Sequence, residues 1–289
     1  MTSLRKAAPR PLKRAGRHVT VLVGAATAPL RLQPDFIMIG AQRCGTTSLY
    51  RALMAHPQVV QPTFHKGINY FDLNYQRGPN WYRGHFPIAE IARHRPASRG
   101  APLAFEASGY YVYHPFAIER MARDLPQVKL VLMLRDPVER AFSAYKHEYA
   151  RGFEWESFER ALELEDERLA GEIDRMRRDP GYESFPHRHH SYRHRGLYAE
   201  QLDRVYRHFP RRQMHVIESE AFFAAPAEQF RLLLAFLGLR PCEPATFGQY
   251  NARQGESMPA KTRRALDDYY APHNERLAGL LGWAPRWAR

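Results

Sequence analysis

The sequence is poor in cysteine, with only Cys44 and Cys242 among 289 residues. Two cysteines provide no disulfide framework, so the composition favours a reducing compartment and predicts a cytoplasmic protein. The chain also lacks CxxC and HExxH, the spacings that commonly bring metal ligands together. We therefore expect no metal site.

Long apolar runs are also missing, and acidic residues are absent from the first 34 positions. The run at 19–30 is about a dozen residues long and is broken by Gly24 and Thr27, so it is too short to span a bilayer and resembles a signal peptide only weakly. We interpret residues 1–34 as a flexible basic arm ahead of a domain at 35–289. Two alternatives stay open for the arm, namely peripheral contact with a membrane surface and a disordered tail without a partner. Its cationic residues are Arg5, Lys6, Arg10, Lys13, Arg14, Arg17 and Arg31.

Positive charge and apolar residues are plentiful. A hydrophobic content of 44% is ample for a core, and the net charge of +13 indicates anionic partners. Nucleic acid, anionic lipid, a phosphorylated cofactor and an acidic glycan all satisfy that charge. No nucleic-acid-binding module is recognisable, so we expect a small-molecule or glycan partner and no nucleic acid. The oligomeric state is not encoded in any pattern that we recognise.

The segment 35–54 combines an apolar run, a loop bracketed by Gly40 and Gly45, and apolar residues at helical spacing. A strand, a glycine-bracketed loop and a helix start together direct backbone N–H groups at an anion. The pattern departs from the nucleotide P-loop, because Thr46 stands where that motif has lysine. Arg43 is the only cation in the loop, and its position suits a shorter anion than a triphosphate. A turn without a ligand is the alternative. The predicted anion-binding residues are Arg43, Cys44, Gly45, Thr46, Thr47 and Ser48.

A second strand-to-helix junction follows the nearly continuous apolar run at 128–134. Such a run is typical of a strand covered on both faces of a parallel sheet. Arg135 comes at its end, Asp136 is well placed as a helix N-cap and Pro137 as the first helical residue. The helix is predicted to continue to Tyr149. Arg135, the Ser143 hydroxyl and the helix N-terminus make this a second candidate anion site.

The remaining pattern alternates strands with helices. We expect one α/β domain with a central, mostly parallel sheet flanked by helices, a three-layer P-loop-like fold. The loops at 40–48, 62–72, 106–111 and 135–143 follow predicted strands and should line one cleft. Further expectations are strands at 59–60, 103–106 and 214–217, helices at 115–123, 197–209 and 229–239, an irregular stretch at 73–101, one solvated helix across 153–180, an exposed basic loop at 182–195 (with a histidine metal site as the alternative), and a final helix interrupted at 272–274.

These two junctions resemble known motifs. The string from Ile39 to Leu49 looks like the 5′-phosphosulfate loop of sulfotransferases that use 3′-phosphoadenosine 5′-phosphosulfate (PAPS), and the string from Leu134 to Tyr145 is similar to their 3′-phosphate segment. Arg135 and Ser143 match the residues that hold the 3′-phosphate. The resemblance covers about residues 34–285 and is greatest to the carbohydrate branch, the heparan sulfate N- and O-sulfotransferases and their bacterial relatives.

The resemblance implies transfer of a sulfuryl group from PAPS, without a metal, to a hydroxyl or amine of a carbohydrate or glycolipid. Arg43 would replace the usual lysine and neutralise charge on the leaving group. Tyr198 matches a position near the cofactor, and Arg253 lies in a stretch that resembles a closing loop. A nucleotide kinase-like phosphotransferase is the alternative, and the missing lysine after Gly45 argues against it.

One departure concerns the catalytic base. Gly67 stands where the family usually has a glutamate, and Ala107 where it tends to have a lysine. The hypothesis is that Glu106 or His65 serves as base and Lys66 as the substituted cation. The alternative is that Glu106 is a structural carboxylate and the acceptor needs little help from a base.

Overall fold

The computed structural model describes residues 21–62, 67–94, 100–242, 247–248 and 257–288. At its centre is a five-stranded sheet in the order β2-β3-β1-β4-β5, in which every neighbouring pair is parallel. This confirms the predicted α/β fold with a parallel sheet. The strands are β1 (Phe36–Gly40), β2 (Val59–Val60), β3 (Leu103–Ala107), β4 (Lys129–Leu134) and β5 (Met214–Glu218).

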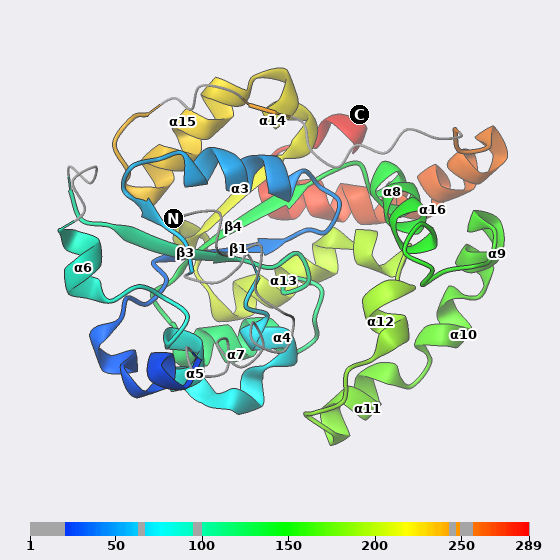
Figure 1. Cartoon of the computed structure of the whole chain (residues 1–289). Helices are drawn as coiled ribbons and strands as arrows, with labels where there is room; N and C mark the ends of the chain where they lie inside the picture. Colours follow the sequence, from blue (N-terminus) through cyan, green and yellow to red (C-terminus); the bar gives the residue numbers. More distant parts are fainter. Residues whose placement is uncertain (1–20, 63–66, 95–99, 243–246, 249–256, 289) are drawn as a thin grey trace, which may run out of the picture.

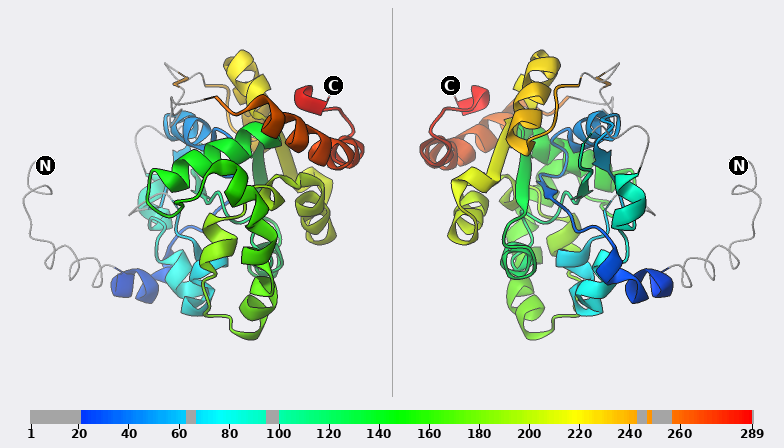
Figure 2. Two further views of the ribbon diagram at one scale, coloured as in Figure 1. Left: turned by 90° about the vertical axis from the view of Figure 1, so that its right-hand side faces the viewer. Right: turned by 90° about the vertical axis from the view of Figure 1, so that its left-hand side faces the viewer.

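Helices cover both faces of the sheet (Figure 1). The helices α3, α14 and α15 lie on one face, and α4, α5, α7 and α13 lie on the other, as the turned views also show (Figure 2). The helices are α3 (Thr46–Met54), α4 (Tyr70–Leu73), α5 (Gly78–Arg83), α6 (Ala89–Arg93), α7 (Ala117–Asp124), α8 (Pro137–Tyr149), α9 (Phe158–Glu163), α10 (Glu165–Leu169), α11 (Glu172–Arg178), α12 (Phe185–His189), α13 (Tyr198–His208), α14 (Ser219–Ala224), α15 (Pro226–Leu237) and α16 (Ala260–Leu281). Short 3₁₀ turns are η1 (Ala28–Leu30), η2 (Tyr75–Arg77), η3 (His194–Gly196), η4 (Arg211–Gln213) and η5 (Arg286–Ala288).

The central strands are apolar on both faces because helices cover both faces. All five residues of β1 are buried, and so are the last five of β4. The Phe36 ring of β1 stacks on Phe105 of β3 with 5.0 Å between ring centroids. Because the strands are parallel, the loops after β1, β3 and β4 emerge at one edge of the sheet, where the sequence predicted a cleft.

The prediction of one solvated helix across 153–180 is wrong. The chain forms three short helices, α9, α10 and α11, and the last is preceded by Gly171 in the left-handed region at φ 73°. Glu165, in α10, is fully buried and accepts hydrogen bonds from the backbone N–H groups of Arg193 (2.7 Å) and His194 (2.9 Å). Helical periodicity predicted the helical state correctly, but this tertiary contact ties the segment to the body of the protein.

The prediction of an exposed basic loop at 182–195 is also wrong. The segment forms α12 and part of η3, and it buries His187, His190 and Arg195. Its density of histidine and arginine was misleading, because these side chains donate to backbone carbonyls and stack on tyrosines instead of facing water. The metal alternative gains no support, since no group of three or more potential ligands occurs among the described residues.

Two further expectations differ in detail. Helix α16 runs without interruption through Pro272, because Leu266, Tyr270 and Leu277 bury a continuous face that outweighs one lost backbone hydrogen bond. The stretch at 73–101, predicted to be irregular, contains the short helices α5 and α6 among its described residues.

The described part of the predicted arm is docked on the domain. Residues 21–26 are helical, and Gly24 packs so tightly on Gly84 that an added Cβ would lie 2.6 Å from the Gly84 carbonyl oxygen. Arg83 Nε donates to the Arg31 carbonyl at 2.8 Å. Among the helices described, none is long and apolar enough to cross a membrane.

Candidate anion-binding site

The first predicted loop joins the carboxyl end of β1 to the N-terminus of α3. Arg43 (φ 71°) and Gly45 (φ 83°) both adopt left-handed backbone conformations, which curl the chain tightly into the helix. Arginine rarely adopts this conformation, so the fold sustains a local strain at the loop tip. The N-cap residue of α3 is Gly45, which has no side chain to cap the helix, and Thr46 and Thr47 are partly exposed beside it. The helix N-terminus and the two threonine hydroxyls can bind an anion.

The structure brings the two predicted anion sites together. Arg43 Nε donates to Ser143 Oγ at 3.0 Å, across 100 residues of sequence. Arg135 Nη1 lies 3.5 Å from the Arg43 carbonyl oxygen, and Arg135 Nη2 lies 3.5 Å from Glu139 Oε2. Both Arg135 contacts are at the long limit of a hydrogen bond, and the Arg135 side chain is 31% exposed. Two cations and one hydroxyl therefore line a single partly exposed surface.

The N-terminus of α8 is not available to an anion. Asp136 Oδ1 accepts from the backbone N–H groups of Val138 (2.8 Å) and Glu139 (3.4 Å), so the helix is capped by its own carboxylate. Asp136 was correctly predicted as N-cap, and for that reason the expectation that this helix end also binds an anion is corrected. In the second junction the polar groups open to a ligand come from Arg135 and Ser143.

Tyr198 lies behind both loops rather than on their open side. It is buried, and its hydroxyl donates to the Arg135 carbonyl oxygen at 2.9 Å and lies 3.7 Å from Cys44 Sγ. Burial raises the pKa of the Cys44 thiol to about 11. Cys44 is therefore a neutral packing residue at ordinary pH, fully buried, and its backbone N–H donates to the Ala41 carbonyl oxygen at 3.3 Å. Tyr198 holds the two anion loops in fixed relation to each other.

Sequence reasoning missed a second brace on the first loop. Arg195 Nη1 forms a short hydrogen bond with Gln42 Oε1, and Arg195 Nη2 donates to the His187 carbonyl oxygen at 3.0 Å. The backbone of Gln42 also presses on Gly109, where an added Cβ would lie 3.3 Å from Gln42 Cα. The sequence pattern did not indicate the contact between Arg195 and Gln42, because Arg195 falls in the segment that was predicted to be an exposed loop.

Glu106 is fully buried at the end of β3. Its carboxylate accepts from the Tyr111 hydroxyl (2.6 Å), the Tyr82 hydroxyl (2.7 Å) and the Ile68 backbone N–H (3.1 Å). Burial raises the pKa of Glu106, and these hydrogen bonds act in the opposite direction. Because both oxygens are engaged and neither is exposed, this geometry favours the structural alternative for Glu106. His65, Lys66 and Arg253 lie outside the described residues.

The neighbouring carboxyl group of Asp72 was not singled out from the sequence. It accepts from the Leu73 N–H at 2.8 Å and from Ser108 Oγ at 3.3 Å, and burial raises its pKa to about 7. Gly67, close by, has φ 75°, and a Cβ there would lie 3.3 Å from the Ala107 carbonyl oxygen. A glutamate at position 67 would thus strain the backbone in this conformation.

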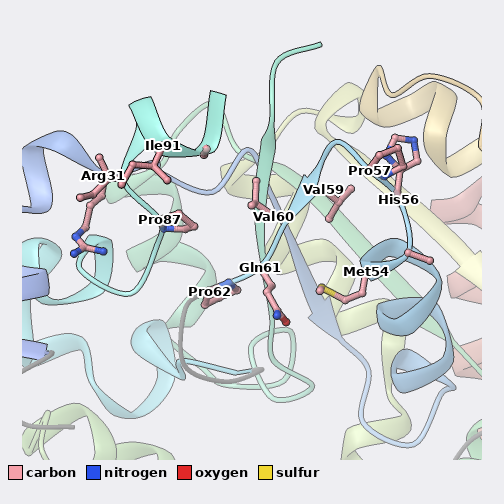
Figure 3. Close-up of a pocket in the computed structure, with 13 residues that line it drawn as sticks. Arg31, Met54, His56, Pro57, Val59, Val60, Gln61, Pro62, Pro87 and Ile91 are labelled. Carbon is pink, nitrogen blue, oxygen red and sulfur yellow. The ribbon is translucent and has the colours of Figure 1, made fainter. Parts of the chain in front are cut away.

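A separate pocket of about 660 Å³ lies at the outer edge of β2, away from the anion loops (Figure 3). Apolar and proline residues dominate its wall, and Val60, Gln61 and Pro62 follow one another along one side (Figure 3). Its shape and lining do not match the charged donor groups of the anion site.

The fold and the two joined loops define an α/β protein in which Arg43, Arg135 and Ser143 meet where two strand-to-helix junctions lie side by side. Residues 33–247 match a family model described as sulfotransferase domain, so the chain belongs to the sulfotransferase family. This match favours sulfuryl transfer over the alternative of a nucleotide kinase.

Individual relatives agree with that assignment. A sulfotransferase from Alicyclobacillus acidocaldarius of known structure is 31% identical, with a TM-score of 0.64 over 89% of this chain and 100% of that one. The bifunctional heparan sulfate N-deacetylase/N-sulfotransferase of Drosophila melanogaster is 26% identical over 86% of this chain and 26% of that protein. The membrane-associated sulfotransferase kil1 of Dictyostelium discoideum is 27% identical over 88% of this chain and 66% of its own length. The chain thus spans about a quarter of the heparan sulfate relative.

Proposed function

We propose that the protein transfers a sulfuryl group from PAPS to a hydroxyl or amine of a carbohydrate or glycolipid acceptor. The observation that carries the proposal is the junction of Arg43, Ser143 and Arg135, because it places two cations and a hydroxyl where the two strand-to-helix loops meet. The carbohydrate acceptor is supported by similarity to enzymes whose names specify heparan sulfate.

The residues present fit this donor. The N-terminus of α3 with Thr46, Thr47 and Ser48 would hold the 5′ anionic group, and Arg135 with Ser143 would hold the 3′-phosphate. When bound, PAPS supplies the sulfuryl group. Arg43 would stabilise the charge that develops on the leaving oxygen, and it would do so by electrostatics alone because arginine does not give up its proton. Cys44 and Gly45 would contribute backbone groups to the first loop, and Tyr198 would hold the two loops together. Arg253 is proposed as a donor contact from the sequence pattern alone.

For the base that takes the acceptor proton we propose Asp72 or His65. Asp72 is the described carboxyl group whose pKa, about 7, suits proton transfer near neutral pH. Ser108 Oγ donates to both Asp72 and Asn69, and Asn69 Oδ1 would lie 3.6 Å from a Cβ at position 67, where the family usually has a glutamate. Glu106 would then support this wall from behind through its hydrogen bonds with Tyr82 and Tyr111.

We also propose a cytoplasmic protein that contacts membranes peripherally through its N-terminal region. Leu22, Val23 and Leu30 remain 70%, 52% and 63% exposed although the segment that carries them is docked. They follow directly on the basic stretch of residues 5–17, and basic residues beside apolar ones favour an anionic lipid surface. A membrane-associated relative supports this. Sedimentation with phosphatidylserine vesicles, compared with phosphatidylcholine vesicles, tests it, and Leu22→Ser with Leu30→Ser should reduce binding to the anionic vesicles.

The first experiment is thermal unfolding with adenosine 3′,5′-bisphosphate, with ATP and with 5′-AMP, all in EDTA. A ligand at about 100 times its dissociation constant stabilises the folded state by roughly 2.7 kcal/mol. Stabilisation by the bisphosphate, followed by sulfation of an N-deacetylated heparan when PAPS is added, would support the proposal. Stabilisation only by ATP with magnesium would refute it.

A further inference from the structure

Two arginine side chains are buried behind the anion loops. Arg140, in α8 one turn before Ser143, is 0% exposed, and Arg195, in η3, is 3% exposed. Arginine is rarely buried to this extent without a carboxylate partner. Neither side chain forms an ion pair with an aspartate or glutamate of the described residues.

Their hydrogen-bond partners are all neutral. Arg140 Nη2 forms a short bond with the Tyr192 carbonyl oxygen, and its Nε and Nη1 have no hydrogen-bond partner of ordinary geometry among the described residues. Arg195 donates to Gln42 Oε1 and to the carbonyls of His187 and Arg188, and its Nε has no such partner.

The aromatic groups that contact the Arg195 guanidinium do not cancel its charge. The Arg195 guanidinium lies 5.2 Å and 4.8 Å from the ring centroids of Tyr110 and Tyr113, which are neutral rings. Glu148 acts on Arg195 from a distance, since its Oε2 is engaged by His189 Nδ1 at 3.0 Å and by Arg151 Nη1 at 3.4 Å, and its buried Oε1 has no hydrogen-bond partner in the described part of the chain. Among the described residues, therefore, neither Arg140 nor Arg195 has a carboxylate at ion-pair distance.

Both cations adjoin the first anion loop. Arg195 contacts Gln42 directly, and Arg140 lies in α8 one turn before Ser143, whose hydroxyl accepts from Arg43 of the first loop at 3.0 Å. A buried charge without a partner costs several kcal/mol, so a fold that retains two such charges beside one loop has a use for them.

We propose that Arg140 and Arg195 form a buried cation pair that holds the anion loops at positive potential, so that the charge of the bound donor, rather than a protein carboxylate, compensates them. The inference rests on the proposed function, because the donor is the anion concerned. Neither arginine touches the donor in this scheme. Both arginines act through their electrostatic field, which solvent screens weakly in the protein interior. Arg195 in addition positions Gln42 at the loop tip.

The test compares Arg140→Met with Arg140→Lys by calorimetric titration with adenosine 3′,5′-bisphosphate and by thermal unfolding of the protein without ligand. Methionine keeps the apolar bulk and removes the charge. We expect Arg140→Met to bind the bisphosphate about tenfold more weakly or worse, while its Tm without ligand is unchanged or higher. Lysine should restore most of the affinity. The loss should be smaller for 5′-AMP, which carries less charge.

Arg168→Met is the matched control. Arg168 pairs with the buried carboxylate of Glu154 at 2.7 Å, in the helical segment 158–178. Its loss should lower Tm and leave bisphosphate affinity unchanged, the opposite signature. Bisphosphate binding by Arg140→Met equal to that of the parent, or a lower Tm with equal losses for both nucleotides, would overturn the inference. A parent protein that does not bind the bisphosphate would overturn the proposed function itself. If Arg140→Met does not fold, Arg140→Gln is judged by the same two measurements.

Discussion

We expect Arg135 and Ser143 to bind the 3′-phosphate of the donor. Comparing the affinities of two nucleotides tests this contact. The perturbations are Arg135→Ala and Ser143→Ala, titrated with adenosine 3′,5′-bisphosphate and with 5′-AMP. The two ligands differ only in the 3′-phosphate. A group that contacts this phosphate must therefore lower affinity for the bisphosphate and leave the affinity for 5′-AMP nearly unchanged.

The magnitude follows from the contacts of Arg135 in the protein without ligand. Its side chain is 31% exposed, and its two hydrogen-bond contacts with described residues are both long, at 3.5 Å, so little has to be broken when a phosphate binds. A hydrogen bond to a charged group contributes about 1.5–3 kcal/mol, which corresponds to roughly a 10- to 150-fold change in Kd. We expect Arg135→Ala to fall in this range for the bisphosphate.

Ser143→Ala should cost less, because the hydroxyl is neutral and already accepts from Arg43 Nε at 3.0 Å. Lysine at position 135 should recover charge but not the bidentate geometry, so Arg135→Lys should be intermediate. Isothermal titration in EDTA measures all of these variants. Equal losses for the bisphosphate and for 5′-AMP in Arg135→Ala would refute the assignment of the 3′-phosphate to Arg135.

Three further predictions concern other parts of the structure. If Asp72 is the base, turnover should fall as the pH drops through about 7, because the carboxyl group becomes protonated. Asp72→Asn should lower kcat about 10²–10⁴-fold and leave the affinity for the bisphosphate unchanged. An unaltered kcat would leave His65 as the proposed base. Gly196→Ala should lower the free energy of unfolding by about 1–3 kcal/mol in chemical denaturation, because the new Cβ would lie 2.6 Å from the Tyr270 hydroxyl. Gly279, in α16, has open space around it, so Gly279→Ala should raise the free energy of unfolding by roughly 0.5–1 kcal/mol. Iodoacetamide at pH 8 should label Cys242 and spare Cys44, whose burial raises its pKa to about 11, and rapid labelling of both thiols in the native protein would contradict the described packing.

The sequence by itself determined the parallel sheet and the position of both anion loops. Continuous apolar runs such as 128–134 specify a strand that is covered on both faces, and a glycine-bracketed loop before a helix specifies where N–H groups converge. These are local patterns, so they can be read without knowing which segments meet. Arg43, Arg135 and Ser143 were found in this way, and the chain brings them together.

Tertiary structure alone decided which polar residues lie on the partly exposed side of the two loops and which are buried behind them. Glu106 and Arg195 are charged residues of types that usually lie at the surface. Here the Glu106 carboxylate accepts hydrogen bonds from two tyrosines, and the Arg195 guanidinium lies beside the rings of two others. Tyr82 is 24 residues from Glu106 in the sequence, and the two tyrosines beside Arg195 are farther still from it. Whether a charge is buried depends on the packing around it rather than on its neighbours in the chain.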